Sequence, residues 1–370
     1  MRPAILVLSV LAFLFIIGLG IMITVGSGGH GYVSTDILVS KYDSSGGNIW
    51  STTINSGKDD YATAVIETSD GGYAIAGWIA DRHGSPNYPR VIRLDSAGGK
   101  LWDRTLDLPA VYSVEIAEAP DGGFVVAQNI NNFDSGTISK IDADGRPVWN
   151  RTTGSAFRDI IATGNGRFAL AGSGTLLIDG NGTTIRDLPI PSTSILPATD
   201  GGFYLEQSGV PYTIASVFRL DENGTVIWKR PVGSSESGKI TSLHENSQGD
   251  LEVVYTFWDP KKDKDLVMYM ESDLVTLGKD GNTSGTRSIV AVDPLCRTTD
   301  GGYAFLAYPF PDSAAYTTLA HADSTLHMVR LSPQGAVIQD KSLNLRQWIA
   351  PKEIIQTRDG GFVTVVVTGS

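Results

Sequence analysis

A short motif that returns along the whole chain limits what this sequence can fold into. The motif is an Asp-Gly-Gly turn followed by an aromatic residue, or a weaker variant of that pattern. Its seven copies occupy residues 70–73, 121–124, 165–168, 200–203, 248–251, 300–303 and 359–362. The last residues of successive copies are separated by 35 (168 to 203) to 59 (303 to 362) residues. Repeats of this length are typical of β-propeller blades.

A second hairpin alternates with the first. Its two strands flank a turn of the form Asp-x-x-Gly, and the returning strand carries a tryptophan in four repeats, namely Trp50, Trp102, Trp149 and Trp228. Weaker versions without the tryptophan begin at Leu176, Leu274 and Met328. Each repeat therefore supplies an inner and an outer hairpin, and the resulting four antiparallel strands form one blade.

Each end of the repeat region holds half a blade. The chain enters the region with an outer hairpin at residues 36–53 and leaves it with an inner hairpin at residues 349–367. If these two hairpins pair, they form a seventh blade and leave no free strand edge at either end. We therefore predict that residues 36–370 form an all-β, seven-bladed β-propeller of four-stranded antiparallel blades, closed by the N- and C-terminal strands. Asp36 and Val367 should then be neighbours.

The outer hairpin resembles the tryptophan-docking hairpin of quinoprotein-like propellers. Leu94-Asp95, Gly99 and Trp102 carry the resemblance, and the same pattern recurs within residues 141–149 and 220–228. The unit is similar to the PQQ-like and WD40-like repeats of membrane-anchored or secreted propeller proteins, and the similarity covers about residues 36–370. Because three units lack the tryptophan, we expect an incomplete docking girdle.

The resemblance also suggests that the chain could be a quinone-dependent enzyme. It implies an adjacent cysteine pair that clamps the cofactor, an eight-bladed ring and an acidic calcium site. This chain has one cysteine, Cys296, and seven repeats. We therefore expect no cofactor, and the fold alone assigns no function.

An apolar segment precedes the repeats. Ala4 to Val25 contains no charged residue, and a helix of that length spans roughly 33 Å, enough to cross a bilayer. We expect a cytoplasmic tail at residues 1–3, a transmembrane signal-anchor helix at residues 4–25 and a flexible linker at residues 26–35. A cleaved signal peptide is the alternative. Arg2 precedes the segment and no Lys or Arg follows until Lys41, so the positive-inside rule places the propeller of this single-pass protein outside the cytoplasm.

Charge and residue usage exclude other classes of protein. The formal net charge is -11, so the chain has no excess of basic residues to neutralise phosphates, and we expect no nucleic-acid partner. The five histidines lack metal-ligand spacing, and the Asp-rich turns do not continue into the ligand spacing of an EF-hand. We expect no metal site, and the sequence identifies no catalytic residue.

The connections between inner and outer hairpins differ greatly in length, whereas the turns inside each hairpin are short and uniform. All of these connections should lie on one face of the ring, and variable loops on a rigid frame are where binding residues concentrate. The candidate binding residues there are Arg82, His83, Tyr88, Trp258, Lys261, Lys262, Tyr308, Phe310, Tyr316 and His321.

We interpret the chain as a membrane-anchored, extracytoplasmic binding module for an unknown protein, glycan or small ligand at the membrane surface. The alternatives are an enzyme, either quinone-linked or glycan-acting, and a structural component of the cell envelope. Four Asn-x-Ser/Thr sequons are candidate N-glycosylation sites, at Asn150, Asn181, Asn223 and Asn282.

Overall fold

The computed structural model describes most of the repeat region. The described residues are 34–80, 87–108, 113–130, 135–207, 214–233, 238–258, 270–290, 293–309, 316–317, 325–345 and 349–369. The predicted anchor at residues 4–25 lies outside them. Within the described ranges, no helix has the length and apolar character needed to cross a lipid bilayer.

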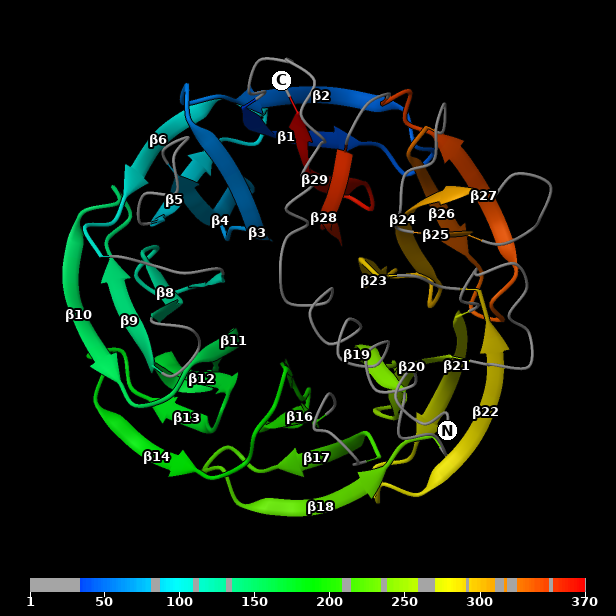
Figure 1. The fold of residues 1–370 in the computed structure, drawn as a ribbon. Coiled ribbons are helices and arrows are strands. Elements are labelled where there is room, and N and C mark those ends of the chain that lie inside the picture. The colour runs from blue at the N-terminus through cyan, green and yellow to red at the C-terminus, as the bar shows by residue number, and fades with distance from the viewer. Residues whose placement is uncertain are drawn as a thin grey trace, which may run out of the picture. The chain divides into compact units, whose positions relative to one another are not determined.

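Residues Ser34–Ser370 form one compact unit of seven β-sheets, arranged as blades around a central axis (Figure 1). In blades 1 to 6 the strands follow one another from the inside of the ring to its edge. Blade 1 contains β3 (Asp59–Glu67), β4 (Tyr73–Ala80), β5 (Tyr88–Leu94) and β6 (Lys100–Thr105). Blade 2 contains β7 (Val114–Glu118), β8 (Phe124–Ile130), β9 (Ser135–Ile141) and β10 (Pro147–Thr153). Blade 3 contains β11 (Phe157–Thr163), the 3-10 turn η1 (Gly164–Gly166), β12 (Arg167–Gly172), β13 (Thr175–Ile178) and β14 (Thr184–Leu188).

The remaining blades of this series follow the same plan. Blade 4 contains β15 (Ser194–Pro197), β16 (Phe203–Gln207), β17 (Ser216–Leu220) and β18 (Val226–Pro231). Blade 5 contains β19 (Lys239–Glu245), β20 (Leu251–Trp258), β21 (Met270–Leu277) and β22 (Thr283–Ile289). Blade 6 contains β23 (Leu295–Arg297), β24 (Tyr303–Pro309), β26 (His327–Leu331) and β27 (Val337–Ser342), with a short extra strand β25 (Tyr316–Thr317) beside β24.

The seventh blade, here called the closing blade, joins the two ends of the repeat region. It contains β28 (Ile349–Gln356), β29 (Phe362–Gly369), β1 (Thr35–Tyr42) and β2 (Asn48–Ile54). β1 and β29 are antiparallel from the pair Thr35 and Gly369 to the pair Tyr42 and Phe362. The predicted blade number and the predicted closure are both confirmed, and Asp36 lies beside Val367 because Ile37 is the direct partner of Val367.

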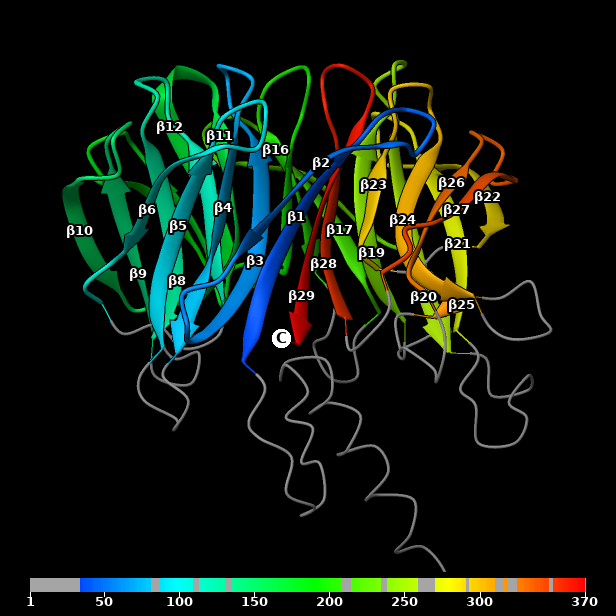
Figure 2. The same ribbon diagram turned by 90° about the horizontal axis from the view of Figure 1, so that it is seen from above.

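Both kinds of hairpin turn lie at one end of the blades, the turn face (Figure 2). In the outer turn of blade 1, the Asp95 carbonyl accepts the N–H of Gly98, and the Asp95 side chain accepts the N–H groups of Ala97 and Gly99. Gly98 has a φ of 81°, which favours glycine, and Gly71 has a φ of 87° in the inner turn. The opposite end, where hairpins and blades are connected, is the variable face.

The hydrophobic core consists of seven clusters, and each cluster lies between two neighbouring blades. The aromatic residue that ends the inner motif enters these clusters. Phe124, Phe203 and Phe362, for example, are at most 1% exposed. The repeated motif therefore sets the turn with its glycines and the inter-blade packing with its last residue.

Each outer strand also donates a hydrogen bond to the outer turn of the next blade. Four indole Nε1 groups donate to backbone carbonyls, in the pairs Trp50–Ser96, Trp102–Ala143, Trp149–Gly180 and Trp228–Lys279, at 2.9 to 3.2 Å. The three units without tryptophan use the pairs Arg186–Asn223, Arg287–Pro333 and Gln339–Ser45. The tryptophan girdle is incomplete, as predicted, but polar side chains restore the inter-blade hydrogen bond at each gap.

A buried cation braces the inner turn in five blades. The pairs are Lys41–Asp359, Arg93–Asp70, Lys140–Asp121, Arg219–Asp200 and Arg330–Asp300, and the cationic side chains are 4% to 16% exposed. In blades 3 and 5 the inner motif begins with Asn165 and Gln248, and the cation is replaced by Leu177 and Thr276. The aspartate and the cation are therefore present together or absent together.

Candidate functional site

The structure describes some of the residues predicted to bind a ligand on the variable face. Tyr88 begins β5 and is half-buried. Trp258 ends β20, and Tyr316 lies in β25 opposite Pro309. Tyr308 is buried in the core between blade 6 and the closing blade, and its hydroxyl donates to the carbonyl of Ile349 at 2.9 Å. Outside the described residues lie Arg82, His83, Lys261, Lys262, Phe310 and His321.

The four sequon asparagines are all exposed. Asn181 and Asn223 occupy the same position in the outer turns of blades 3 and 4, and Asn282 follows the outer turn of blade 5. Asn150 lies on β10 at the outer edge of the ring. Three of the four therefore belong to the turn face, away from the variable connections.

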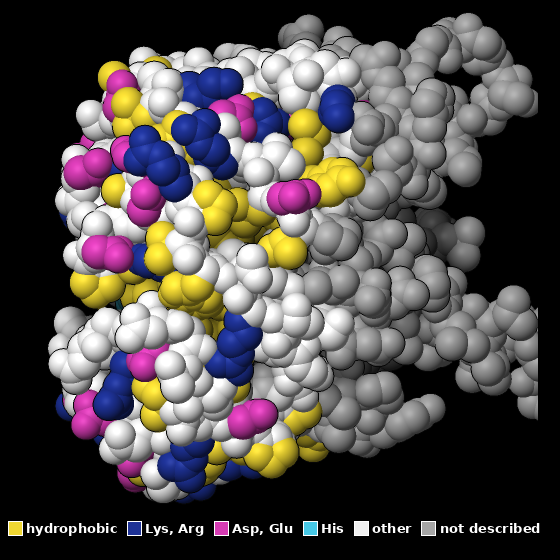
Figure 3. Space-filling view, turned by 90° about the vertical axis from the view of Figure 1, so that its left-hand side faces the viewer, with side chains coloured by type: hydrophobic (Ala, Val, Ile, Leu, Met, Phe, Trp, Pro, Cys, Tyr) yellow, Lys and Arg dark blue, Asp and Glu magenta, His cyan; other side chains and the backbone are white. Residues whose placement is uncertain are grey.

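The outer edge of the ring also exposes single apolar side chains. Ile49, Leu101, Val148, Ile185, Ile227 and Ile338 each stand one residue before the docking position of their outer strand and are 41% to 59% exposed. On the side that carries β6, β10 and β14, hydrophobic side chains lie among basic and acidic ones (Figure 3). Isolated exposed apolar residues of this kind are ordinary on a soluble surface.

Three carboxyl groups occupy one repeated position of the inner strands, which lie nearest the central axis of the ring (Figure 1). The position lies six residues before the first residue of the inner motif. Around the ring it holds Ala64, Glu115, Asp159, Ser194, Ser242, Pro294 and Glu353. These acids were not among the residues predicted from the sequence, although superposing the repeats would have placed them together.

Burial raises the pKa of all three carboxyl groups. The pKa of Glu353 rises to about 8, where burial is the largest cause and the charges of Asp159 and Asp293 add to it. The pKa of Asp159 rises to about 6 because of burial, although three hydrogen bonds oppose the shift. The pKa of Glu115 lies well above its ordinary value because of burial and of the negative charges of Asp159 and Glu353. Asp159 raises the pKa of both glutamates, and Glu353 raises that of Glu115, so the three acids are coupled.

Two of these acids also connect neighbouring blades. Asp159 Oδ2 accepts the N–H of Ile195 at 2.9 Å and the hydroxyl of Ser194 at 3.1 Å, both in blade 4. Glu353 accepts the N–H of Val65 in blade 1. The three inner-strand acids therefore ionise less readily than ordinary carboxyl groups, and Asp159 and Glu353 hold neighbouring inner strands together.

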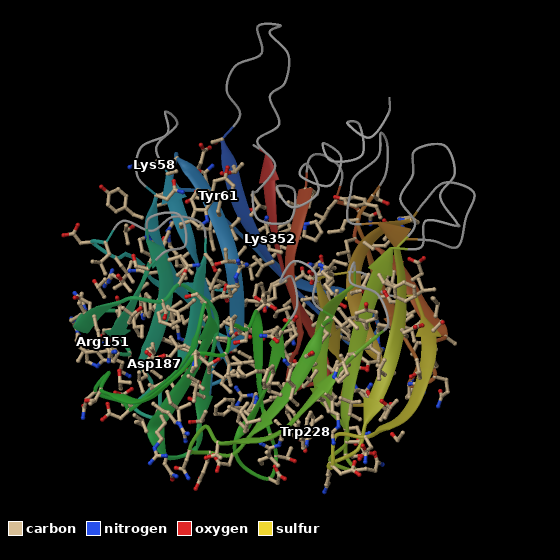
Figure 4. All side chains as sticks on the ribbon, turned by 60° about the horizontal axis from the view of Figure 1, so that its bottom comes forward. Lys58, Tyr61, Arg151, Asp187, Trp228 and Lys352 are labelled. Carbon is tan, nitrogen blue, oxygen red and sulfur yellow. The ribbon has the colours of Figure 1, made fainter. Side chains whose placement is uncertain are left out.

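Basic groups accompany the acids on the inner strands. Lys352, labelled in Figure 4, precedes Glu353 at a β-bulge of β28. Burial lowers the pKa of its amine. Lys239 Nζ lies 3.7 Å from Asp293. Among the residues that the structure describes, no group of three or more His, Cys, Asp or Glu side chains is arranged to hold a metal ion.

A hollow of about 760 Å³ lies on the turn face between the closing blade and blade 1. Trp50 and Tyr73 form part of its wall, with ring centroids 5.6 Å apart. Its charged groups are already paired, Lys41 with Asp359 and Arg358 with Glu67. The hollow therefore offers an aromatic wall with few unpaired charges.

Comparisons with known proteins bear on the fold alone. No protein-family model and no curated protein matches the sequence. A solved structure of a protein from Lactobacillus plantarum matches with a TM-score of 0.53 and 13% identity, over 84% of this chain and 96% of that chain. A protein of unknown function from Bacteroides caccae matches with a TM-score of 0.42 and 15% identity, over 69% and 94%. Prolyl oligopeptidase B from Galerina marginata matches with a TM-score of 0.47 and 10% identity, over 84% and 47%.

The identities of these three matches are all low, and among the three the Lactobacillus plantarum structure alone has a TM-score above 0.5. They carry no information on activity. The sheet topology and this likeness together make the chain a seven-bladed β-propeller.

Proposed function

We propose that this protein is a membrane-tethered, extracytoplasmic binding module that holds its ligand on the variable face. The proposal rests on a difference between the two faces of the ring: the turns on one face are uniform, whereas the connections on the other vary in length. On the turn face, every outer turn has a glycine with positive φ at the same place, namely Gly46, Gly98, Gly145, Gly182, Gly224, Gly281 and Gly335. On the variable face, the hairpins of blade 3 are joined by residues 173–174 and those of blade 5 by residues 259–269. Variable segments on a rigid frame favour recognition.

The tether rests on the sequence of residues 4–25, whose apolar length suits a bilayer, and on Arg2. The kind of repeat rests on the tryptophan-docking hairpins, which resemble those of PQQ-like and WD40-like propellers. The partner is a protein, a glycan or a small ligand at the membrane surface, since the candidate residues combine aromatic and basic groups.

A binding screen tests the site. The full chain is immobilised and screened against glycan and metabolite arrays, and each ligand found is then measured with two variants. In the first variant a short Asn-Gly turn replaces residues 259–269, which include Lys261 and Lys262. The control, Ala97→Asn, alters the turn face but reproduces the residue found at the equivalent positions 181 and 223. We expect the first variant to lose binding and the control to retain it; the opposite pattern would place the site on the turn face.

Membrane attachment is tested separately by deleting residues 1–29. The shortened protein should leave the membrane fraction and retain the β-sheet circular dichroism spectrum of the full chain. A shortened protein that stays with the membranes would assign the attachment to the ring instead.

A further inference from the structure

Four polar side chains form a continuous hydrogen-bonded chain at the variable-face end of blade 6. His327 at the start of β26 places Nδ1 2.5 Å from Asp340 Oδ1 on β27. Its other ring nitrogen, Nε2, lies 3.2 Å from Thr325 Oγ1. Ser342 Oγ donates to Thr325 Oγ1 at 3.1 Å, and the N–H of Asn344 lies 3.3 Å from Ser342 Oγ.

The direction of each hydrogen bond follows from the chemistry of the groups. An ionised carboxylate only accepts, so Nδ1 of a neutral His327 carries the proton and donates to Asp340. Nε2 is then an acceptor, and the Thr325 hydroxyl donates its proton to it. Ser342 in turn donates to the Thr325 oxygen. A carboxylate that orients an imidazole, which in turn accepts a hydroxyl proton, is the arrangement that activates a hydroxyl as a nucleophile.

The equivalent residues of blade 1 only hold neighbouring strands together, and they differ chemically from the network in blade 6. The strand register places Arg90 and Asp103 of blade 1 at the positions that His327 and Asp340 occupy in blade 6. The Arg90 guanidinium donates to Asp103 twice, at 2.7 Å each, and also to Asp60, so that it holds two carboxylates. A guanidinium cannot accept a proton from a hydroxyl, whereas the imidazole in blade 6 can.

The network is accessible and faces a neighbouring blade. The side chain of His327 is 20% exposed and that of Asp340 is 35% exposed. His327 shares one face of β26 with Val329, which packs in the core between blades 5 and 6. These two blades carry the connections at residues 259–269 and 310–324, which contain half of the predicted binding residues.

We propose that Thr325 is a nucleophile for acyl transfer from carboxylate esters, with His327 as its general base and Asp340 as the residue that positions His327. Thr325 Oγ1 forms a bond to the ester carbonyl carbon while its proton moves to His327 Nε2. The bond from that carbon to the alcohol oxygen then breaks, and the leaving alcohol takes the proton from Nε2. Water repeats the two steps on the acyl-threonine, releasing the carboxylic acid and restoring the hydroxyl.

The test uses p-nitrophenyl acetate as an ester probe on the full chain. We expect release of p-nitrophenolate above the solvent background and an acetyl group on Thr325, located by peptide mass spectrometry after acid quenching. Thr325→Val should abolish both signals. His327→Asn should slow acetylation by about 10² to 10⁴-fold, the usual contribution of general base catalysis.

Asp340→Asn tests the positioning role, since an amide can hold the imidazole but favours the wrong tautomer. It should slow acetylation by at least about 10²-fold while the melting temperature stays close to that of the unaltered protein. The matched control is Ser40→Ala, which removes a hydroxyl that lies 2.9 Å from Ser51 Oγ without any imidazole beside it. This control should react like the unaltered protein.

Acetyl mapping on the unaltered protein decides the proposal even if a variant fails to fold. Absence of acetyl-Thr325, together with p-nitrophenolate release equal to that of Thr325→Val, would mean that the four side chains only hold β26 and β27 together. Neither result depends on whether the variable face binds a separate ligand.

Discussion

At the scale of single residues, Glu353 shows how a buried inner-strand acid links pH to stability. Its pKa in the folded protein is about 8, above the ordinary value of 4.5, because burial disfavours the charged form. The folded state therefore binds more protons than the unfolded state between these two values. The contribution of Glu353 to stability is complete below about pH 4.5 and is lost as the pH rises through about 8.

We expect Glu353→Gln to flatten this dependence, because glutamine accepts the same N–H of Val65 but does not ionise. The unaltered protein should lose unfolding free energy between about pH 5 and about pH 9, and the variant should lose less. Urea unfolding at several pH values measures the difference. Glu222→Gln, in an exposed turn, is the control and should leave the slope unchanged. If both variants match the unaltered protein at every pH, the raised pKa of Glu353 is wrong.

At the scale of the strand and its turn, each inner hairpin with a buried cation should lose different amounts of stability when the cation or its aspartate is removed. Arg93 has a side chain only 7% exposed, whereas its partner Asp70 is 65% exposed. The pKa of Asp70 is lowered to about 2, chiefly by the Thr68 hydroxyl and the N–H of Gly72, with Arg93 adding to the shift. Removing the aspartate therefore leaves a buried charge with one partner fewer, whereas removing the arginine leaves an exposed carboxylate.

Asp70→Asn should for this reason destabilise the protein more than Arg93→Met does. We expect about 1 to 3 kcal/mol for the loss of the charged partner of a buried group. Arg93→Met should cost less, because the Asp70 carboxylate remains solvated. Chemical unfolding of both single variants and the double variant gives the order. A larger loss for Arg93→Met would mean that packing of the arginine stem dominates the pair.

The docking of the tryptophans predicts that two adjacent residues of β6 differ in how much they contribute to stability. The Trp102 ring packs on Gly145 of blade 2 and donates to Ala143, whereas Leu101 is 56% exposed. Trp102→Ala should destabilise by up to about 3 kcal/mol, toward the low end for large core truncations because the ring is only half-buried. Leu101→Ala should stay within about 0.5 kcal/mol, as for an ordinary surface position. Equal melting temperatures for the two variants would show that the ring carries no inter-blade stability.

At the scale of the whole molecule, the ring could be predicted from the sequence because the signals that specify it are local. An Asp-Gly-Gly turn such as 70–72 specifies a hairpin, and counting hairpins gives both the blade number and the closure. The inner-strand acids share one repeated position, so superposing the repeats would have brought them together. The Thr325–His327–Asp340 network was missed for a physical reason, because the proximity of its residues depends on which strands lie side by side and on a β-bulge between Arg330 and Leu331, which places Asp340 opposite Val329. Local sequence does not fix such a register.

The ring is closed by hydrogen bonds between β1 and β29 and not by a covalent bond, and this leads to a prediction for the whole ring. Thr35 and Gly369 are direct partners at the end of the β1–β29 ladder, so a short linker can join them without strain. A circular permutant of residues 34–369, joined there and opened within residues 259–269, should keep the β-sheet spectrum and unfold in one cooperative transition. By contrast, deleting residues 349–370 removes β28 and β29 and exposes the edge of β1, which should abolish cooperative unfolding and promote aggregation. Circular dichroism melts and size-exclusion chromatography compare the two. If the permutant melts in two steps while the truncated chain stays monomeric and cooperative, the closing blade does not hold the ring together.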